Sequence, residues 1–243
     1  MENTNIPGHV GGYNFEEGEI LLFDKPYDWT SFDLVNKVRC MLKYQLRKKH
    51  IKVGHAGTLD PLATGLMIVC TGKATKKIEQ LSGLDKEYVA SIELGAVTPT
   101  YDLESLVEHH KPYHHVTQQH VEQALDRFRG SIMQIPPVFS AIKIKGEKAY
   151  ELARRGETVD LSPRPVRIHQ LEIEAFDLPR VVLRIKCSKG TYIRSLAHDI
   201  GQAVGVGAHL TDLCRTQIGE FSLENALQIE KFERNLRPDA TND

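Results

Sequence analysis

The chain has 243 residues, 41% of them hydrophobic, which is enough for one large domain or two small ones with a packed core. It contains no apolar run near the roughly 20 residues that cross a bilayer and no secretion signal, so we expect a cytoplasmic protein. The formal net charge of −1 gives no indication of a polyanionic partner, so any nucleic-acid site must come from local clustering of charge.

The first predicted elements are a strand over residues 19–26 and a helix that Thr30 or Ser31 caps and that continues to about Tyr44. The expected buried face of this helix consists of Phe32, Val35, Val38 and Leu42. A basic segment begins within the helix, because residues 37–52 hold seven Lys or Arg and no acid. On charge alone, this segment is as typical of a solvated helix face as of a phosphate-binding surface.

The remaining elements indicate a mixed fold. Residues 66–72 predict a short buried strand, and residues 86–95 alternate so that Tyr88, Ala90, Ile92 and Leu94 share one side. A helix is predicted over 116–130 and is closed by Gly130. A strand around 140–146 precedes a second predicted helix over 149–157. In a third helix, over 192–204, an apolar stripe is formed by Ile193, Leu196, Ala197 and Ile200. Residues 166–177 and 181–190 should pair as antiparallel strands. Hairpins with irregularly spaced helices indicate an α+β fold with a largely antiparallel sheet.

The segment KVGHAGTLDPLATGLMIVC, residues 52–70, is the most unusual part of the chain. Its glycines allow tight turns or close approach to a ligand, and Pro61 disfavours a helical conformation at Asp60. Asp60 is therefore a carboxylate on a constrained loop that leads into a buried strand. Taken in isolation, an Asp-Pro turn is the simpler interpretation.

A second candidate region is SKGTYIRSLAHDIG, residues 188–201. The predicted strand ends at Gly190, so Tyr192 and Arg194 fall at a strand-to-helix junction, where side chains can point along the sheet edge. Arg194 alone could equally be a surface arginine of a first helical turn. Tyr88 lies on an apolar face, and a core tyrosine is its default interpretation.

Neither a metal site nor a cofactor is expected. The four cysteines are widely separated, the histidine-rich stretch at 109–115 is more typical of a polar loop, and the chain contains no glycine-rich nucleotide-binding fingerprint.

Five segments resemble, in the same order, the signatures of the TruB family of tRNA pseudouridine-55 synthases: GHAGTLDPLATG, DKEYVASIELGAVTPTYD, PPVFSAIKIKGEKAYELARRGE, KGTYIRSLAHDIG and GVGAHLTDLCRTQIGEF. The resemblance covers about residues 19–235. It implies an isomerase that converts uridine 55 of the tRNA T-loop to pseudouridine. It also implies the pseudouridine synthase fold, with a central, mostly antiparallel sheet and a thumb-like insertion at about 130–160. We expect one catalytic domain over 13–237, disordered residues 1–12 and 238–243, and no C-terminal PUA domain.

The resemblance also assigns roles to individual residues. Asp60 matches the catalytic aspartate, Tyr88 the active-site tyrosine, and Arg194 the arginine that pairs with the aspartate. Three further positions match substrate-binding ones: Tyr192 and Leu213, which with Tyr88 line the uridine pocket, and His55, which enters the T-loop. Phe139 departs from the family pattern, since many relatives have a tyrosine there.

Phosphate contacts are expected from Arg47, Lys48 and Lys49 of the basic segment and from Lys143, Lys145, Arg154 and Arg155 of the insertion. The expected partner is the T-arm of tRNA, with the protein acting as a monomer without an obligate protein partner. Two alternatives are a glycoside hydrolase and an RNA chaperone. A glycoside hydrolase would need a second catalytic carboxylate that the sequence does not suggest, and an RNA chaperone would bind tRNA without isomerising it.

Overall fold

The computed structural model describes residues 9–10, 12–140, 142–144 and 146–236. It divides into two compact units, one made of the chain up to Leu84 and from Cys214 onwards, the other of Asp85–Leu213. Strand β14 (Ala208–Ile218) contributes residues to both. The catalytic domain expected over residues 13–237 therefore consists of two separately packed parts, which are described in turn.

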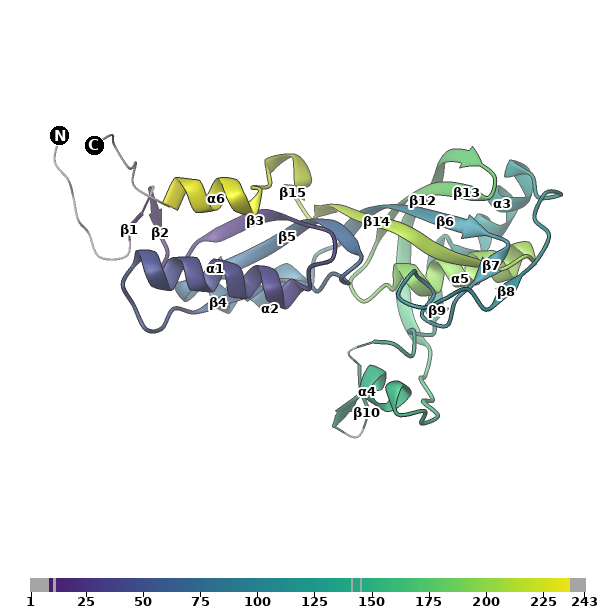
Figure 1. The fold of residues 1–243 in the computed structure, drawn as a ribbon. Coiled ribbons are helices and arrows are strands. Elements are labelled where there is room, and N and C mark those ends of the chain that lie inside the picture. The colour runs from purple at the N-terminus through teal and green to yellow at the C-terminus, as the bar shows by residue number, and fades with distance from the viewer. Residues whose placement is uncertain (1–8, 11, 141, 145, 237–243) are drawn as a thin grey trace. The chain divides into compact units, whose positions relative to one another are not determined.

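The first unit is a small sheet with helices on both faces. Its strands are β1 (His9–Val10), β2 (Tyr13–Asn14), β3 (Ile20–Lys25), β4 (Val53–His55), β5 (Ala63–Thr71) and β15 (Phe221–Ser222), and its helices are α1 (Ser31–Gln45), η1 (Gly72–Lys77), α2 (Ile78–Ser82), η3 (Leu223–Asn225) and α6 (Ile229–Leu236) (Figure 1). Strands β3 and β4 pair antiparallel with β5, which also neighbours β14. Strand β15 pairs antiparallel with the end of β14.

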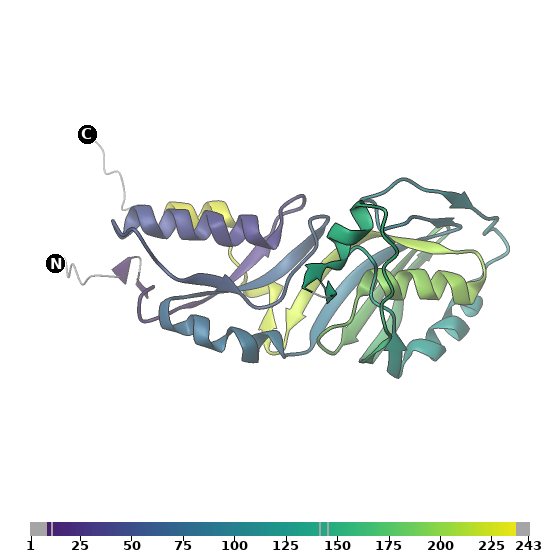
Figure 2. The same ribbon diagram turned by 90° about the horizontal axis from the view of Figure 1, so that it is seen from below.

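Residues 66–70 of strand β5 are all apolar, and both faces of the strand are covered. Met67 and Val69 belong to a core cluster with α1 and α6, whereas Leu66, Ile68 and Cys70 belong to a second cluster that includes Leu81 of α2. Figure 2 shows α1 and α6 along one face of this sheet and α2 along the other. Burial on both faces explains why the sequence of β5 lacks the alternation of a half-exposed strand.

Helix α1 begins where the capping pattern predicts. The Thr30 hydroxyl accepts from the Asp33 amide at 3.0 Å, and the Asp33 carboxylate accepts from the Thr30 amide at 2.9 Å. The prediction that Phe32 is buried is wrong, since it is 64% exposed. At about 100° per residue, Phe32 lies roughly 120° from Val38 around the helix, whereas Ser31 lies within about 20° of it and is buried.

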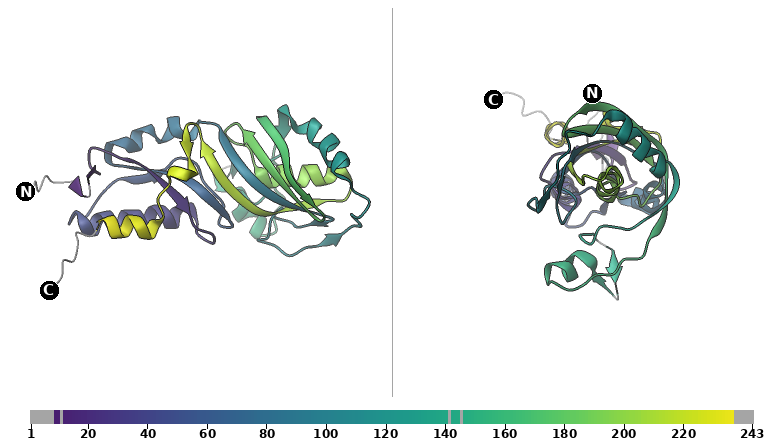
Figure 3. Two further views of the ribbon diagram at one scale, coloured as in Figure 1. Left: turned by 90° about the horizontal axis from the view of Figure 1, so that it is seen from above. Right: turned by 90° about the vertical axis from the view of Figure 1, so that its right-hand side faces the viewer.

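The second unit is an antiparallel sheet with helices packed against it. Its elements are β6 (Lys86–Leu94), β7 (Ala96–Val97), β8 (His109–His110), α3 (Gln118–Leu125), η2 (Asp126–Phe128), β9 (Gly130–Gln134), β10 (Lys143–Ile144), β11 (Glu147–Lys148), α4 (Ala149–Arg154), β12 (Arg164–Asp177), β13 (Arg180–Cys187) and α5 (Ile193–Val204). The strand order is β14-β6-β13-β12-β9, in which β6–β13, β13–β12 and β12–β9 are antiparallel (Figure 3).

Two apolar patterns of this unit are confirmed. The predicted stripe of α5 is buried, and so is the predicted face of β6 that carries Tyr88. Gly201 allows α5 to approach the start of β14, because a Cβ there would lie 2.1 Å from the Ala208 amide nitrogen. Helix α3 packs against α5 and β12, so both helices cover the sheet.

The segment between β9 and β12 leaves the sheet. These two strands are paired neighbours, yet residues 135–163 separate them and carry the β10–β11 hairpin and α4 (Figure 1). This excursion corresponds in position to the insertion expected around 130–160.

Two predicted helices are longer than the observed ones. Helix α3 ends at Leu125 and gives way to η2, and Gly130 (φ +87°) opens β9 instead of closing the helix. Pairing of residues 130–134 with β12, which is remote in sequence, determines this boundary. Helix α4 ends at Arg154, two residues before Gly156 (φ +76°).

The α+β fold is confirmed. Within the described residues, no helix is both long and apolar enough to cross a bilayer. Of the residues expected to be disordered, 9–10 pair with 13–14 and residue 12 is a turn. The others lie outside the described residues: 1–8, 11 and 238–243.

Candidate active site

The loop that carries Asp60 is fixed by the start of α1. The Ser31 hydroxyl donates to the Leu59 carbonyl at 3.0 Å and accepts from the Leu59 amide at 2.8 Å. The Ala63 amide donates to the Asp60 carbonyl at 3.1 Å. Gly57 adopts a positive φ of 99°, which favours glycine. Asp60 is half-buried on a short, multiply anchored turn between β4 and β5.

Arg215 of β14 anchors the same loop from within the unit. It is 1% exposed, and its guanidinium donates to three carbonyls: Leu66 at 2.8 Å, Thr58 at 3.3 Å and Gly57 at 3.1 Å. A Cβ at Gly65 would lie 2.4 Å from the Arg215 carbonyl oxygen, so this glycine is required for the close approach of β5 and β14. The buried arginine therefore joins β14 to the turn just before Asp60.

Lys25 provides a second buried cation close to the loop. Its side chain is 0% exposed, and its ammonium donates to the carbonyls of Pro26 at 2.9 Å, Trp29 at 2.6 Å and Pro61 at 3.3 Å. Burial lowers the pKa of Lys25 to about 8, while the negative charge of Asp60 opposes that shift. The Lys25 ammonium therefore places a positive charge in the neighbourhood of the Asp60 carboxylate.

His55 ends β4, five positions before Asp60. It is half-buried, and burial lowers its pKa below the usual value. Burial thus favours the neutral form of the imidazole. A neutral ring can lie against a nucleobase without introducing a buried charge.

Arg194 lies in the second unit and is an interior residue. It is 6% exposed, and its Nε lies 3.5 Å from Oδ2 of Asp102, which is 4% exposed. The guanidinium also donates to the carbonyls of Thr100 at 3.2 Å and Phe139 at 3.1 Å. The surface interpretation of Arg194 is therefore wrong. The contact at Phe139 uses the backbone carbonyl, so it does not depend on the identity of the side chain there.

The other three predicted pocket residues also lie in the second unit. Tyr88 is buried on β6 opposite Ile185 of β13, and Leu213 is buried on β14. Tyr192 precedes α5 and is held by Gln134, whose side-chain amide donates to the Tyr192 carbonyl at 3.0 Å and accepts from its amide at 2.8 Å. This two-point contact fixes the backbone at the strand-to-helix junction.

Comparison with known families decides the classification. The sequence model described as "TruB family pseudouridylate synthase (N terminal domain)" matches residues 43–193, more than half of the chain. Residues 194–241 match a second one, described as "tRNA pseudouridylate synthase B C-terminal domain". The chain belongs to the TruB family.

Two relatives named tRNA pseudouridine synthase B are similar to the chain over almost their whole length. The chain is 55% identical over 219 residues to the tRNA pseudouridine synthase B of Phocaeicola vulgatus, covering 90% of this chain and 93% of the relative. It is 54% identical over 220 residues to the protein of the same name from Parabacteroides distasonis, covering 90% and 94%.

A solved structure agrees with this assignment. The chain is 28% identical, with a TM-score of 0.65, to a protein in the structure of an H/ACA RNP bound to a substrate RNA containing 2′-deoxyuridine. The match covers 90% of this chain and 53% of that protein, so the chain spans about half its length. The pseudouridine synthase fold predicted from the TruB resemblance is confirmed.

The TruB candidates divide between the two units. Asp60 and His55 belong to the first, and Tyr88, Tyr192, Arg194 and Leu213 belong to the second. Arg194 was expected to pair with Asp60; the structure pairs it with Asp102 of its own unit, and the pairing with Asp60 stays a prediction. Among the described residues, no group of three or more His, Cys, Asp or Glu could hold a metal ion.

Some of the predicted phosphate-binding cations already form ion pairs with acidic side chains. Arg155 pairs with Glu147 and Glu157, both at 2.6 Å, and Lys48 pairs with Glu16. Arg154 lies 5.6 Å from the ring centre of Tyr150. Lys143, Arg47 and Lys49 complete the predicted set: Lys143 is exposed on β10, Arg47 and Lys49 are exposed after α1, and Lys145 lies outside the described residues.

Four residues that support the candidate site were not predicted: Lys25, Arg215, Asp102 and Gln134. A signal exists for Lys25, because it continues the buried alternation of Leu21 and Phe23 along β3. Arg215 similarly follows buried Leu213 at a spacing of two on β14.

Proposed function

We propose that the chain is a tRNA pseudouridine synthase that isomerises uridine 55 of the T-loop, with Asp60 as the catalytic carboxylate. The observation that carries the proposal is the 55% identity, over 90% of the chain, to a curated tRNA pseudouridine synthase B. The anchored carboxylate loop supports it, since a rigid loop suits a residue that must meet one atom of a substrate.

The reaction is an isomerisation, so its atoms balance without a second substrate. The bond between ribose C1′ and uracil N1 breaks, the base turns, and C1′ joins C5. The C5 proton leaves, and N1 gains a proton. A single positioned carboxylate can serve as nucleophile or base in such a sequence. Three routes use it: attack on C1′, attack on the base, or removal of a ribose proton to give a glycal, the route we favour.

Asp60 must remain ionised for each route. Lys25 is proposed to supply a positive charge near Asp60, and Arg194 is proposed as the arginine that pairs with this carboxylate. Tyr88 is proposed to stack against the extruded uracil and to offer its hydroxyl for proton transfer, while Tyr192 and Leu213 line the pocket. His55 is proposed to occupy the place that the flipped base vacates, offsetting part of an unstacking cost of a few kcal/mol.

A direct assay tests the function. The purified protein is incubated with an unmodified tRNA transcript, and pseudouridine is mapped by position. Conversion at uridine 55 alone supports the proposal. A protein that binds the transcript tightly and leaves every uridine unchanged would instead be an RNA chaperone. The proposed enzyme works as a monomer in the cytoplasm, where its tRNA substrate is found, and light scattering of the free protein tests the monomer.

Lys25 predicts a pH effect. Above about pH 8 its ammonium loses the proton, so pseudouridine formation should decline between pH 7 and 9. Unfolding is not the cause of this decline. The pKa of Lys25 is about 8 in the folded protein and 10.5 in the unfolded chain, so the unfolded chain binds more protons between pH 8 and 10.5. Lys25 therefore makes the fold more stable as pH rises through this range. Single-turnover rates against pH should show the decline in wild type and not in Lys25→Met, whose rate is lower throughout. An identical alkaline decline in the folded variant would contradict this role.

Arg215 predicts a positioning effect. Lysine keeps the charge, but its compact ammonium cannot reproduce the planar, spread donors with which the guanidinium contacts the carbonyls of Leu66, Thr58 and Gly57. Arg215→Lys should therefore lower the free energy of unfolding by about 2–3 kcal/mol. With the loop loosened, kcat should fall by roughly 10- to 100-fold while KM for tRNA changes less. Arg39→Lys is the matched control, because Arg39 donates to one carbonyl, that of Val53. A folded Arg215→Lys protein with wild-type kcat would show that the loop does not need this anchor.

A further inference from the structure

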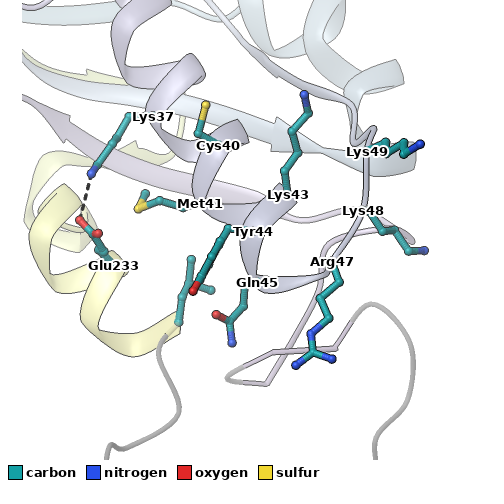
Figure 4. Close-up of a pocket in the computed structure, with 11 residues that line it drawn as sticks. Lys37, Cys40, Met41, Lys43, Tyr44, Gln45, Arg47, Lys48, Lys49 and Glu233 are labelled. Carbon is teal, nitrogen blue, oxygen red and sulfur yellow. Dashed lines mark ion pairs between the residues drawn. The ribbon is translucent and has the colours of Figure 1, made fainter.

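The end of α1 forms one side of a groove that the proposed chemistry does not use. The groove is lined by the last turns of α1, the following residues to Lys49, and Glu233 and Leu236 of α6. All of these residues belong to the first unit. Figure 4 shows Met41 and Tyr44 on the side of α1 that faces α6, with Arg47 extending beyond the helix end. We call this feature the basic groove.

Charge in the basic groove is strongly positive. Its lining includes the cations Lys37, Lys43, Arg47, Lys48 and Lys49, and Glu233 is the acid among the described lining residues. Lys37 pairs with Glu233 at 3.1 Å, and Lys48 pairs with Glu16, so acids compensate these two cations. Among the described residues, Lys43, Arg47 and Lys49 form no ion pair with an acid. Three such cations exceed what the partial negative charge of a helix C-terminus requires. The surplus favours an anionic ligand.

Tyr44 adds an exposed aromatic ring to the basic groove. It is 85% exposed, the second most exposed large hydrophobic side chain among the described residues after Leu106. Met41 and Leu236 provide an apolar floor beside it. An exposed ring next to cations is the arrangement on which single-stranded nucleic acids stack a base, while their phosphates contact Lys and Arg.

The backbone gives an independent reason to regard Arg47 as functional. The Arg47 amide donates to the Tyr44 carbonyl at 3.2 Å and the Lys48 amide to the Lys43 carbonyl at 3.0 Å, which is a Schellman motif with Arg47 in the left-handed position. Its φ is +51°, where glycine is favoured and a side chain is strained. A glycine at position 47 would relieve the backbone strain but would provide no cation. The arginine instead places its guanidinium at the groove.

We propose that the basic groove binds an unpaired nucleotide segment of the RNA substrate, with one base stacked on Tyr44 and phosphates held by Lys43, Arg47 and Lys49. A duplex fits the observations less well, because its bases are already stacked and present no face to Tyr44. An acidic peptide would use the cations but would not need the ring. The inference rests on the proposed function in taking the ligand to be RNA.

The test uses fluorescence anisotropy of the full-length protein with a labelled single-stranded RNA of eight nucleotides that contains no uridine. Tyr44→Ala should weaken binding by about 5- to 100-fold, whereas Tyr44→Phe, which keeps the ring, should stay within about twofold of wild type. Phe32→Ala is the matched control, because Phe32 is an exposed aromatic residue on the first turn of the same helix. An eight-base-pair duplex should bind Tyr44→Ala and wild type equally.

Arg47→Gly provides the second arm. It should weaken RNA binding and reduce the log-log salt slope by about 0.7, while thermal unfolding shows unchanged or increased stability. Lys231→Ala, an exposed cation of α6 outside the groove, should leave binding unchanged. Equal affinity of Tyr44→Ala and wild type for the single strand would overturn the proposal. So would equal competition by polyglutamate of matched charge, which would indicate an acidic protein partner.

Because the oligonucleotide contains no uridine, binding is measured without turnover. A protein that binds it through Tyr44 yet forms no pseudouridine in tRNA would overturn the proposed function and support the groove. Conversely, full isomerase activity with oligonucleotide binding that ignores Tyr44 would overturn the groove alone.

Discussion

Asp60→Asn should abolish pseudouridine formation while tRNA binding persists. Asparagine keeps nearly the same volume and can accept a hydrogen bond, so the turn held by Ser31 and Arg215 should survive. Its amide is neither a useful base nor a nucleophile. We expect single-turnover rates to fall by at least about a thousandfold, equivalent to roughly 4 kcal/mol in the barrier.

Two controls make the Asp60→Asn result interpretable. Filter binding with the unmodified transcript should give a Kd within a few-fold of wild type, and chemical denaturation should show a folded protein. Asp24→Asn is the matched carboxylate variant, since Asp24 lies on β3 of the same unit and accepts from Gln228 at 2.9 Å. A folded, tRNA-binding Asp60→Asn protein that still isomerises uridine near the wild-type rate would remove Asp60 from the mechanism.

Local sequence patterns predict the elements whose boundaries are set locally. The cap of α1, the alternation of β6 and the stripe of α5 are all present as predicted. Strand β9 was missed because its residues become a strand by pairing with β12, and Met133 on it remains exposed. Such an edge strand carries little apolar alternation, so its identity depends on partner residues 30 to 38 positions away in the sequence.

The residues that support the site are also harder to predict where their contacts come from distant parts of the sequence. Asp60 is conspicuous in the sequence because Gly57 and Pro61 flank it. Arg215 is not, because its three carbonyl acceptors precede it by about 150 residues and become its neighbours through the pairing of β5 with β14. Lys25 was missed for a different reason: its position in the alternation of β3 predicts burial, but its charge predicts exposure, and the carbonyl acceptors that resolve the conflict lie on turns.

The pair of Arg194 and Asp102 gives the second large expected effect. Both side chains are almost fully buried, so removing Arg194 leaves the Asp102 carboxylate in the interior without this cation. Arg194→Gln should lower the free energy of unfolding by about 3–5 kcal/mol. Asp102→Asn should cost less, because the asparagine oxygen still accepts a hydrogen bond. Chemical denaturation of each variant measures these changes.

The double variant separates a structural role of Arg194 from a catalytic one. The double variant removes both members of the ion pair, so neither faces the other's missing charge, and it should be more stable than the sum of the single losses predicts, by about 1–3 kcal/mol. Arg184→Gln is the control, because Arg184 pairs with Glu87 and Glu174 nearer the surface and should cost less than about 1 kcal/mol. If Arg194 also opposes the charge of Asp60 during catalysis, the double variant regains stability and stays inactive. Recovery of pseudouridine formation along with stability would restrict Arg194 to holding the second unit together.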